Sequence, residues 1–441
     1  MSYELIGILI FLSMMLMLLT GQRVFGAIGG VATLFALMLW GKGAAEMPFS
    51  AAFGLLNWYV LLTLPLFIYM GYMFSESGIA SDLYRMFHVW FGPVSGGLAI
   101  GTMGLMVAVS AMNGLSVAGM AIGASLALPE MLKRNYNKVM VTGVIQAGSS
   151  LGIMVPPSVV LVLYGMIARQ SVGQLWLAGV FPGFLLAGLF MAYIYIRCRL
   201  QPHLGPTLSP EELKTITWGE KFRLLRAGII PLVIILSMTG LFLIGITSLV
   251  QCSAVGATAT TIAALVKGRL NRRVLDETLK NTLSVSCMFM WVILAALSFG
   301  AVFDGLGAVH AIESLFLERW GLGPWGVLIM MQFTYLLMGT FLDDTAMLII
   351  VAPLYVPLVI NLGFNPIWYG VLYTITCQIA YMTPPFGYNL FLMKAMAPKE
   401  VSLADIYRSI IPFVLVMIVG LAIVMLFPGI ALWLPNLYFG R

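Results

Sequence analysis

Residues 152–165 read GIMVPPSVVLVLYG, a double proline inside an otherwise apolar stretch. Proline removes a backbone donor and clashes with the preceding turn, so two in a row end a helix. In lipid, the freed carbonyl and amide groups must be satisfied by protein or by trapped water. Either this segment lies outside the membrane, or the break is a functional site.

The composition of the whole chain is that of a membrane protein. Of 441 residues, 61% are hydrophobic and 9% are charged, against roughly 45–50% apolar residues in soluble domains. Apolar stretches of about 18 to 25 residues, long enough to cross a hydrocarbon core, recur from end to end. We therefore predict an all-α polytopic membrane protein. The predicted spans are 4–20, 24–41, 53–75, 95–112, 113–131, 174–198, 227–246, 248–266, 282–302, 323–341, 342–360 and 408–434.

The net charge of +6 is confined to loops. Basic residues gather in 197–226 and 267–280, which the positive-inside rule assigns to the cytoplasm, and Lys133, Arg134 and Lys138 indicate a third cytoplasmic turn. Because these charges are divided among juxtamembrane loops, they do not indicate binding to nucleic acid. The first span lacks a basic n-region and a cleavage site, so we expect a retained helix.

Catalytic and cofactor motifs are missing from the sequence. The three histidines and four cysteines show no metal-ligand spacing, and neither a P-loop nor a GxSxG motif occurs. We therefore expect no enzyme, no organic cofactor and no ATP hydrolysis. An ion gradient or another subunit would then supply the energy for transport.

The chain repeats itself at an offset of about 228 residues. A second double proline lies in MTPPFGYNLF at 382–391, and Pro156 and Pro384 are 228 residues apart. The same offset relates Pro129 to Pro357, and MFSESG at 73–78 matches VFDGLG at 302–307. Each half of a proline unit spans roughly 15 to 17 residues, or about 23 to 26 Å of helix, which is short for a crossing. We therefore predict re-entrant hairpins at 137–168 and 366–397.

Broken helices at matching places in two halves indicate the binding site of a transporter. Two proline kinks without a ligand would give a similar pattern, although their shared offset favours a site. The relation between the halves stays open, because six predicted spans separate 53 from 282 and an inverted pair requires an odd number. Either the repeats are parallel or a span is miscounted, and 95–112 and 113–131 are the suspects.

Polar residues at membrane depth mark a second pair of breaks, at 109–119 and 339–349. Asp343 and Asp344 lie in the apolar run MGTFLDDTAMLIIVAPL, where carboxylates are costly and functional unless they lie at an interface. Asn113, Gly114 and Ser116 occupy the matching break and offer neutral oxygens to a cation. Small residues there would also suit close helix packing.

These breaks resemble the large membrane subunit of TRAP transporters, the tripartite ATP-independent periplasmic systems. The resemblance covers nearly the whole chain and depends on the combination of several motifs. They are LPLFIYMGYMFSESGIA at 64–80, NGLSVAGMA at 113–121, ALPEM at 127–131, GSSLGIMVPPS at 148–158, LAGVFPGFLLA at 177–187, FLDDTAMLIIVAPL at 341–354 and TPPFGYNLF at 383–391.

This resemblance implies a sodium-coupled, elevator-type importer in the bacterial inner membrane. Its two hairpins would enter from opposite sides as an inverted repeat, in a fold of about 10–12 transmembrane helices. The implied partners are a separate small four-helix membrane subunit and a periplasmic binding protein that delivers a small organic acid, of carboxylate or sulfonate type.

The resemblance also implies site residues. The implied cation ligands, for Na+, are Asn113, Gly114, Ser116, Asp343, Asp344 and Thr345. The implied hairpin tips and substrate path comprise Gly152, Pro156, Pro157, Ser158, Thr383, Pro384, Pro385, Gly387 and Asn389. The family often has SGSS and LDTT where this chain has NGLS and LDDT. Leu115 therefore removes a hydroxyl group, and Asp344 adds a charge that would strengthen cation binding or bring in a proton.

The predicted organisation has four parts: scaffold helices at 1–52, a first repeat at 53–198, cytoplasmic loops and connecting helices at 199–281, and a second repeat at 282–441. Two further functions stay open. A self-sufficient sodium- or proton-coupled carboxylate transporter of related architecture would work without the other components. A membrane-embedded enzyme would use Asp343 and Asp344 around a divalent metal.

Overall fold

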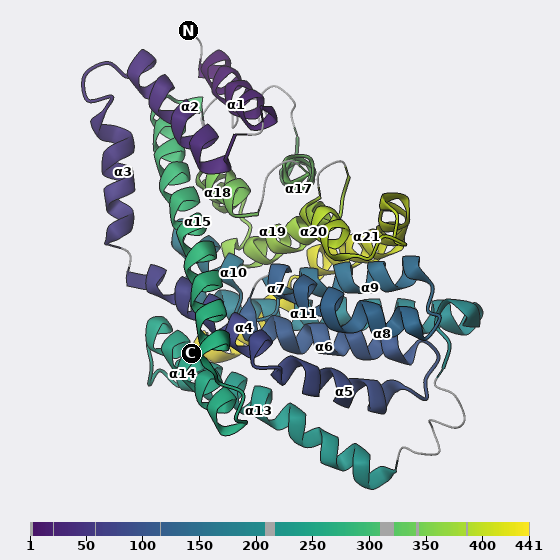
Figure 1. Cartoon of the computed structure of the whole chain (residues 1–441). Helices are drawn as coiled ribbons and strands as arrows, with labels where there is room; N and C mark the ends of the chain where they lie inside the picture. The colour runs from purple at the N-terminus through teal and green to yellow at the C-terminus, as the bar shows by residue number, and fades with distance from the viewer. Residues whose placement is uncertain are drawn as a thin grey trace.

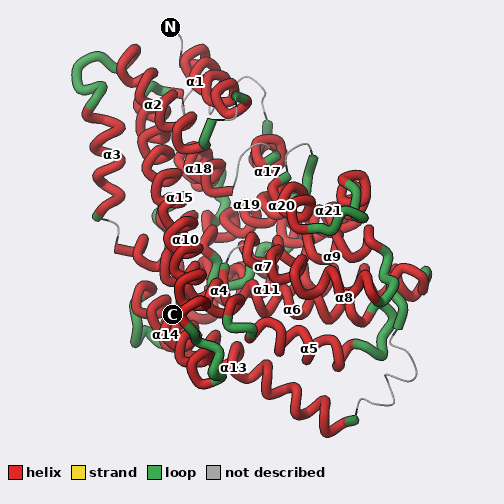
Figure 2. The backbone as a smooth tube through the Cα atoms, viewed as in Figure 1, coloured by secondary structure: helices red, strands yellow, loops and turns green. Residues whose placement is uncertain are grey.

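The computed structural model describes residues 3–20, 22–57, 59–114, 116–207, 217–308, 322–340, 344–384 and 387–440. All regular structure within these ranges is helical, as predicted (Figure 2). Six of the described helices are long and apolar enough to cross a membrane, and four shorter ones are also apolar. The chain is thus an all-α polytopic membrane protein.

One group of helices either lies outside the two repeats or directly precedes one of them in the chain. Figure 1 shows the long helix α15 running beside α2 and α3, and α15 also packs on α4. The helices are α1 (Tyr3–Leu19), α2 (Val24–Leu39), α3 (Glu46–Leu56), η1 (Tyr59–Leu62), α4 (Thr63–Glu76), α13 (Trp218–Leu243), α14 (Leu249–Val266) and α15 (Arg272–Gly305).

The remaining helices follow a similar order in the two halves, with α6, α9, α10 and α11 matched by α17, α19, α20 and α21. In the first half they are α5 (Ile79–Phe91), α6 (Gly97–Asn113), α7 (Ser116–Ile122), η2 (Gly123–Ala127), α8 (Leu128–Lys133), α9 (Lys138–Ser150), η3 (Leu151–Ile153), α10 (Val159–Ile167), α11 (Val172–Leu200) and η4 (Pro202–Leu204). In the second half they are α17 (Pro324–Gly339), α18 (Asp344–Asn361), α19 (Pro366–Tyr381), α20 (Tyr388–Met396), α21 (Leu403–Leu426) and α22 (Gly429–Phe439).

The helix caps reproduce the predicted repeat in atomic detail. Asn137 caps α9 by accepting the backbone N–H groups of the second and third residues after it, and Asn365 caps α19 in the same way. Ser171 and Ser402 cap α11 and α21 with their hydroxyl groups. Such side chains satisfy the amide groups that a helix start leaves free.

The antiparallel hairpins lie one element earlier than the sequence predicted. The backbone N–H of Leu98 contacts the Tyr136 hydroxyl at 3.3 Å, and Thr102 Oγ1 contacts Met131 Sδ at 3.5 Å. Position numbers therefore rise along α6 while they fall along α7–η2–α8, which is the pairing of a hairpin closed near residue 115.

The second half has the same hairpin, formed by α17 and α18. Thr334 Oγ1 and the Tyr355 hydroxyl lie 2.8 Å apart, and the rings of Trp325 and Phe364 meet edge to face at 5.4 Å. Among the described residues, the first hairpin therefore has Gly114 and Ser116 at its closed end, and the second has Gly339 and Asp344.

The double-proline units are broken helices rather than the predicted hairpins at 137–168 and 366–397. The first half-helix, α9, packs on α6, α7 and α21, whereas α10 packs on α11, α18 and α19. In the second unit, α20 packs on α7, α9 and α21. Each unit thus sends its second half-helix against the opposite repeat, so the prolines interrupt a helix without folding it back on itself.

Contacts between helix ends show how the two repeats are oriented relative to each other. The turn before α9 touches the segment after α11, with Asn137 N donating to Leu204 O at 3.1 Å, and Lys138 pairs with Asp405 at the start of α21. The start of α9, the end of α11 and the start of α21 thus lie together. Because basic residues gather there, the positive-inside rule assigns these helix ends to the cytoplasm. Both open ends of the hairpin formed by α6 and α7–η2–α8 then lie on the cytoplasmic side, so this hairpin adds no membrane crossing. The α9–α10 unit crosses the membrane once.

Five crossings separate the repeats when counted from the start of α4 to the start of α15. They are α4, α9–α10, α11, α13 and α14, within the ranges that the structure describes. Five is odd, so α4 and α15 cross in opposite directions, as an inverted pair requires. Counting 95–112 and 113–131 as two crossings was the error, together with overlooking α9–α10.

The last predicted span, 408–434, is divided. The helix α21 ends at Leu426, and Pro428 stands at the N-cap of α22. Proline cannot donate the hydrogen bond that would continue α21. Apolar character continues through the break, which is why hydropathy alone joined the two helices.

Candidate functional site

The first hairpin closes on a glycine in a left-handed conformation. Asn113 is the last residue of α6, and Gly114 caps the helix with φ +66° and donates its N–H to Ser110 O at 3.0 Å. Glycine takes this conformation without steric cost. A Cβ at Gly114 would also lie 2.3 Å from the carbonyl oxygen of Pro157. The position therefore excludes any side chain on two grounds.

The hairpin tip lies against the first double proline. The carbonyl oxygen of Gly114 accepts the backbone N–H of Val159, the first residue of α10, at 3.4 Å. Ser158 caps α10: its hydroxyl oxygen accepts the N–H of Leu161 at 3.1 Å and its hydroxyl group donates to Ile153 O. Two segments that the sequence identified separately thus form one site.

The rest of this break is enclosed. Gly152 lies in the short turn η3 and is buried, as are Pro157 and Ser158, while Pro156 is half-buried. The broken helix therefore exposes its polar backbone groups to protein rather than to lipid.

A buried polar network joins the first hairpin to the second repeat. Ser116 Oγ donates to Asn389 Oδ1 at 3.0 Å, and Asn389 Nδ2 lies 3.3 Å from Ser149 Oγ and 3.4 Å from the carbonyl oxygen of Gln146. Asn389 and Ser149 are fully buried, and Ser116 is 3% exposed. Three elements, α7, α9 and α20, therefore converge through neutral oxygen and amide groups.

The second site is described in part. Asp344 and Thr345 begin α18, but their side chains, like that of Asn113, lie outside the described part of the structure, as do Asp343 and Pro385 entirely. Gly339 ends α17 against α19, where a Cβ would lie 2.5 Å from the Cβ of Ala380. The second hairpin thus approaches the end of α19 as the first approaches the end of α9.

The second double-proline break is held by hydrogen bonds within its own segment. Thr383 Oγ1 donates to Ile379 O at 2.7 Å, and Gly387 N donates to Thr383 O at 3.2 Å. Pro384 is exposed, whereas Gly387 is buried. A Cβ at Gly387 would lie 2.7 Å from the carbonyl oxygen of Tyr381, so this turn also requires glycine.

Several buried amide groups near the breaks lack a partner within the described residues. Both polar atoms of Gln378 on α19 are buried and unpaired, and so are Gln146 Oε1 and Gln332 Nε2. Buried polar groups are normally hydrogen-bonded, so such exceptions point to water or a solute. Gln332 and its partner Thr376, whose Oγ1 donates to Gln332 Oε1 at 2.6 Å, were missed by the sequence reasoning. A lone glutamine in the apolar helix 324–339 was the available signal.

The arrangement presents two kinds of ligand group. Carbonyl, hydroxyl and amide oxygens gather at the first tip, which is the chemistry that unwound transporter helices offer to Na+. The half-helices α10 and α20 begin at the breaks, and helix N-termini attract anions. No group of three or more histidine, cysteine or acidic residues that could hold a metal ion occurs in the described part of the chain.

Known proteins match both the sequence and the fold. The family described as tripartite ATP-independent periplasmic transporter, DctM component, matches residues 11–430. The C4-dicarboxylate TRAP transporter large permease protein DctM of Pseudomonas aeruginosa is 32% identical over 383 residues, covering 86% of each chain. Its counterpart in Vibrio cholerae is 30% identical over 465 residues and covers 98% of each chain.

Among solved structures, the YdaH transporter of Alcanivorax borkumensis superposes with a TM-score of 0.63 at 14% identity, covering 88% of each chain. At that identity the likeness shows the fold alone. The match of the family model across residues 11–430 shows more: the chain is a transporter component rather than an enzyme, and it belongs to the DctM family of large permease subunits of TRAP transporters.

Proposed function

We propose that this large permease imports a small organic anion together with sodium, and that the cation binds where the first hairpin tip meets the second repeat. The observation that carries the proposal is the buried contact between Ser116 and Asn389. It brings neutral oxygens from both repeats beside the turn in which the Gly114 carbonyl oxygen accepts the N–H of Val159.

The cation would be held by the tip of the α6–α7 hairpin. Gly114 is confined to its left-handed turn, so its carbonyl direction is fixed, and Ser116 supplies a hydroxyl oxygen two residues later. Asn389 holds that hydroxyl group from α20. A cation at the tip would therefore order both the hairpin and the second double-proline unit. The second tip, with Asp343, Asp344 and Thr345, is the proposed second cation position.

The anion would be bound beside the starts of α10 and α20. Both half-helices begin within the protein, and their first amide groups carry a partial positive charge. The hydroxyl group of Ser158 caps α10, while Gln378 supplies an amide group without a partner among the described residues. The two relatives compared above are named for C4-dicarboxylates. We infer a small carboxylate or sulfonate as the substrate.

Transport would proceed by an elevator movement. The two hairpins and two broken helices interlock, since α10 and α20 each pack on the opposite repeat. This interlocked set would move as one body against α1–α4 and α13–α15. A small membrane subunit would hold the stationary set, and a periplasmic binding protein would deliver the anion.

The test is uptake into proteoliposomes that contain the chain with its small subunit. A binding protein loaded with labelled succinate, or with the anion that it carries when purified, is supplied outside. We expect uptake only with inward sodium and only with the binding protein. Uptake driven equally by a proton gradient without sodium would contradict the sodium coupling. Equal uptake without the binding protein would instead favour a self-sufficient transporter.

A further inference from the structure

A cavity of about 480 Å³ opens at the basic end of the molecule, away from the hairpin tips. It lies between the start of α9, the end of α11 and the start of α21, and we call it the α9–α11–α21 pocket. Its lining residues are Asn137, Val139, Met140, Tyr193, Arg197, Leu204, Arg408, Ser409, Ile411, Pro412 and Phe413.

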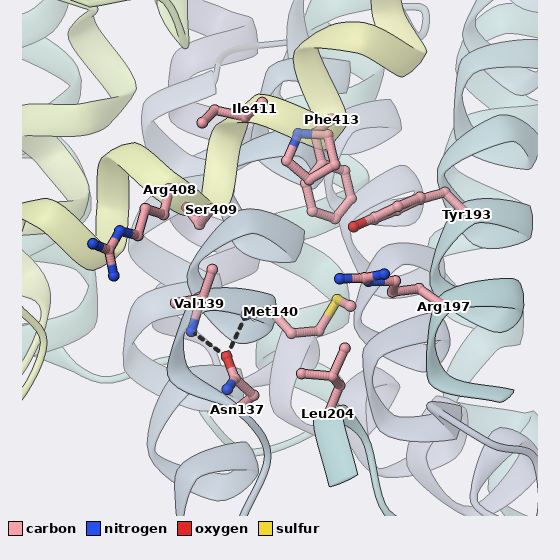
Figure 3. Close-up of a pocket in the computed structure, with 11 residues that line it drawn as sticks. Asn137, Val139, Met140, Tyr193, Arg197, Leu204, Arg408, Ser409, Ile411 and Phe413 are labelled. Carbon is pink, nitrogen blue, oxygen red and sulfur yellow. Dashed lines mark hydrogen bonds between the residues drawn. The ribbon is translucent and has the colours of Figure 1, made fainter. Parts of the chain in front are cut away.

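Two arginines give the pocket its charge. Figure 3 shows the Arg197 guanidinium pointing into the cavity toward Met140, with the Tyr193 hydroxyl pointing into the same space, whereas the guanidinium of Arg408 points away from the other lining side chains. Within the described residues, neither arginine takes part in an ion pair. The nearby carboxylate of Asp405 is already occupied by Lys138, at 2.8 Å. The pocket therefore carries positive charge that the described protein does not neutralise.

The surface beside the pocket is apolar. Ile411 lines the cavity and is 58% exposed, and Leu415, one turn further along α21, is also 58% exposed. On α11, Ile196 next to Arg197 is 56% exposed. In a membrane protein such side chains face lipid tails, while arginines at the cytoplasmic boundary meet lipid headgroups.

The residues that correspond to the pocket lining in the other repeat lie at the opposite end of the molecule, and there a large side chain takes the place of Met140. At the repeat offset of 228, Met140 corresponds to Trp368, which is 2% exposed and donates its indole N–H to Val424 O at 2.9 Å. When α11 and α21 are aligned at their caps, Ser171 and Ser402, Pro428 takes the place of Arg197 and Leu177 that of Arg408. Within the described residues, the cytoplasmic end of this matched pair therefore has two arginines where the other end has Pro428 and Leu177, and it has Met140 where the other end has the buried Trp368 ring.

We propose that the α9–α11–α21 pocket binds an anionic phospholipid of the cytoplasmic leaflet. The phosphate group lies against the Arg197 guanidinium, with Arg408 at the rim of the pocket, and the acyl chains run over Ile411 and Leu415. Arginine binds phosphate through charge-assisted and often bidentate hydrogen bonds. A free phosphate ion would satisfy the same charges, but it would leave the adjoining apolar surface without a role.

The experiment measures thermal unfolding of the purified full chain in neutral detergent, with its small subunit where that co-purifies. Phosphatidylglycerol, phosphatidylcholine and inorganic phosphate are titrated separately. Four proteins are compared: the natural chain, Arg197→Gln, Met140→Trp and Arg199→Gln. Met140→Trp copies the filled arrangement of Trp368. Arg199→Gln is the matched control, because Arg199 lies on the same helix end but does not line the pocket.

We expect phosphatidylglycerol alone to raise the melting temperature. Its apparent affinity should fall about tenfold or more in Arg197→Gln, the loss of one hydrogen-bonded charge contact, and in Met140→Trp, but not in Arg199→Gln. If Met140→Trp folds poorly, native mass spectrometry of lipid retained by Arg197→Gln decides. Equal lipid affinity in Arg197→Gln and the natural chain would overturn the proposal. Equal stabilisation by inorganic phosphate would overturn it as well, by showing an anion site without lipid.

Discussion

Ser116 Oγ lies 3.0 Å from Asn389 Oδ1, although 273 residues of chain separate them. The first residue belongs to the helix that follows the NGLS tip, and the second follows the second double proline. The two repeats therefore meet through a buried polar contact at the place where each is broken. Burying polar groups at membrane depth costs free energy, so we infer that this contact serves the function of the protein.

Asn389→Leu should destabilise the fold and abolish uptake. The change leaves the buried hydroxyl group of Ser116 without its acceptor, which costs about 1–3 kcal/mol, while Ser149 loses the Asn389 amide donor but still donates to Gln146 O. Gln378→Leu is the contrasting variant, because both polar atoms of Gln378 already lack partners within the described residues. It should leave the free energy of unfolding unchanged or higher while lowering uptake. Chemical unfolding and proteoliposome uptake of both variants test this, and equal destabilisation by both would contradict it.

Gly114→Ala should impair the hairpin tip more than positive φ alone explains. Alanine at φ +66° is strained by about 1 kcal/mol, and its Cβ would also meet Pro157 O at 2.3 Å. Gly245 has φ +81° with nothing within 4 Å of its Cβ position, so Gly245→Ala measures the strain by itself. Melting temperatures of the two variants give the difference. A loss no greater in Gly114→Ala than in Gly245→Ala would show that the tip does not contact the proline break.

Cysteine crosslinking should locate the hairpins. In a chain without its four native cysteines, Thr102→Cys with Met131→Cys should crosslink rapidly, because Thr102 Oγ1 and Met131 Sδ lie 3.5 Å apart. Met140→Cys with Ile167→Cys would face each other only if α9 and α10 were antiparallel, and this pair should stay uncrosslinked. Gel mobility after oxidation measures both. The reverse result would show that the double-proline unit, and not α6 with α7–η2–α8, forms the hairpin.

Much of this architecture could be read from the sequence. Pro156 and Pro384 at one offset predicted two related breaks, and Asn137 and Asn365 confirm the repeat as matching caps. Hydropathy could not distinguish a hairpin from two crossings, since α6 and α7–α8 are each apolar enough to be counted as a span. Nor could it show that Asn389 would contact Ser116, because this pairing depends on how the two repeats interlock. The sequence named both residues but not their contact.

The pH dependence of stability should reveal how α5 is attached. Burial opposes ionisation of Asp82, but hydrogen bonds from Lys267 and Arg269 outweigh it and lower the pKa of this carboxyl below its ordinary value of 3.8. A lowered pKa stabilises the folded state above the unfolded pKa and ceases to do so as the pH falls through the folded one. Asp82→Asn should therefore lower stability at pH 7, by about 1 kcal/mol, and the deficit should shrink as the pH falls below about 4.

The control for this titration is Asp276→Asn, which removes an exposed pair with Lys280 on a single helix. It should change the melting temperature little at any pH, since exposed pairs contribute little. A deficit of Asp82→Asn that stays constant down to pH 3 would mean that its ionised carboxylate does not stabilise the fold.

The most direct test of the central claim is the melting temperature of the purified protein, titrated with sodium against potassium at constant ionic strength. A site that binds only the folded state should stabilise it by RT ln(1 + [L]/Kd), about 1.4 kcal/mol at sodium tenfold above Kd. We predict stabilisation by sodium alone, lost in Ser116→Ala and kept in Ser125→Ala, whose exposed hydroxyl lies further along the same helical segment. Equal curves for the two salts, or full sodium stabilisation in Ser116→Ala, would contradict a cation site at this hairpin tip.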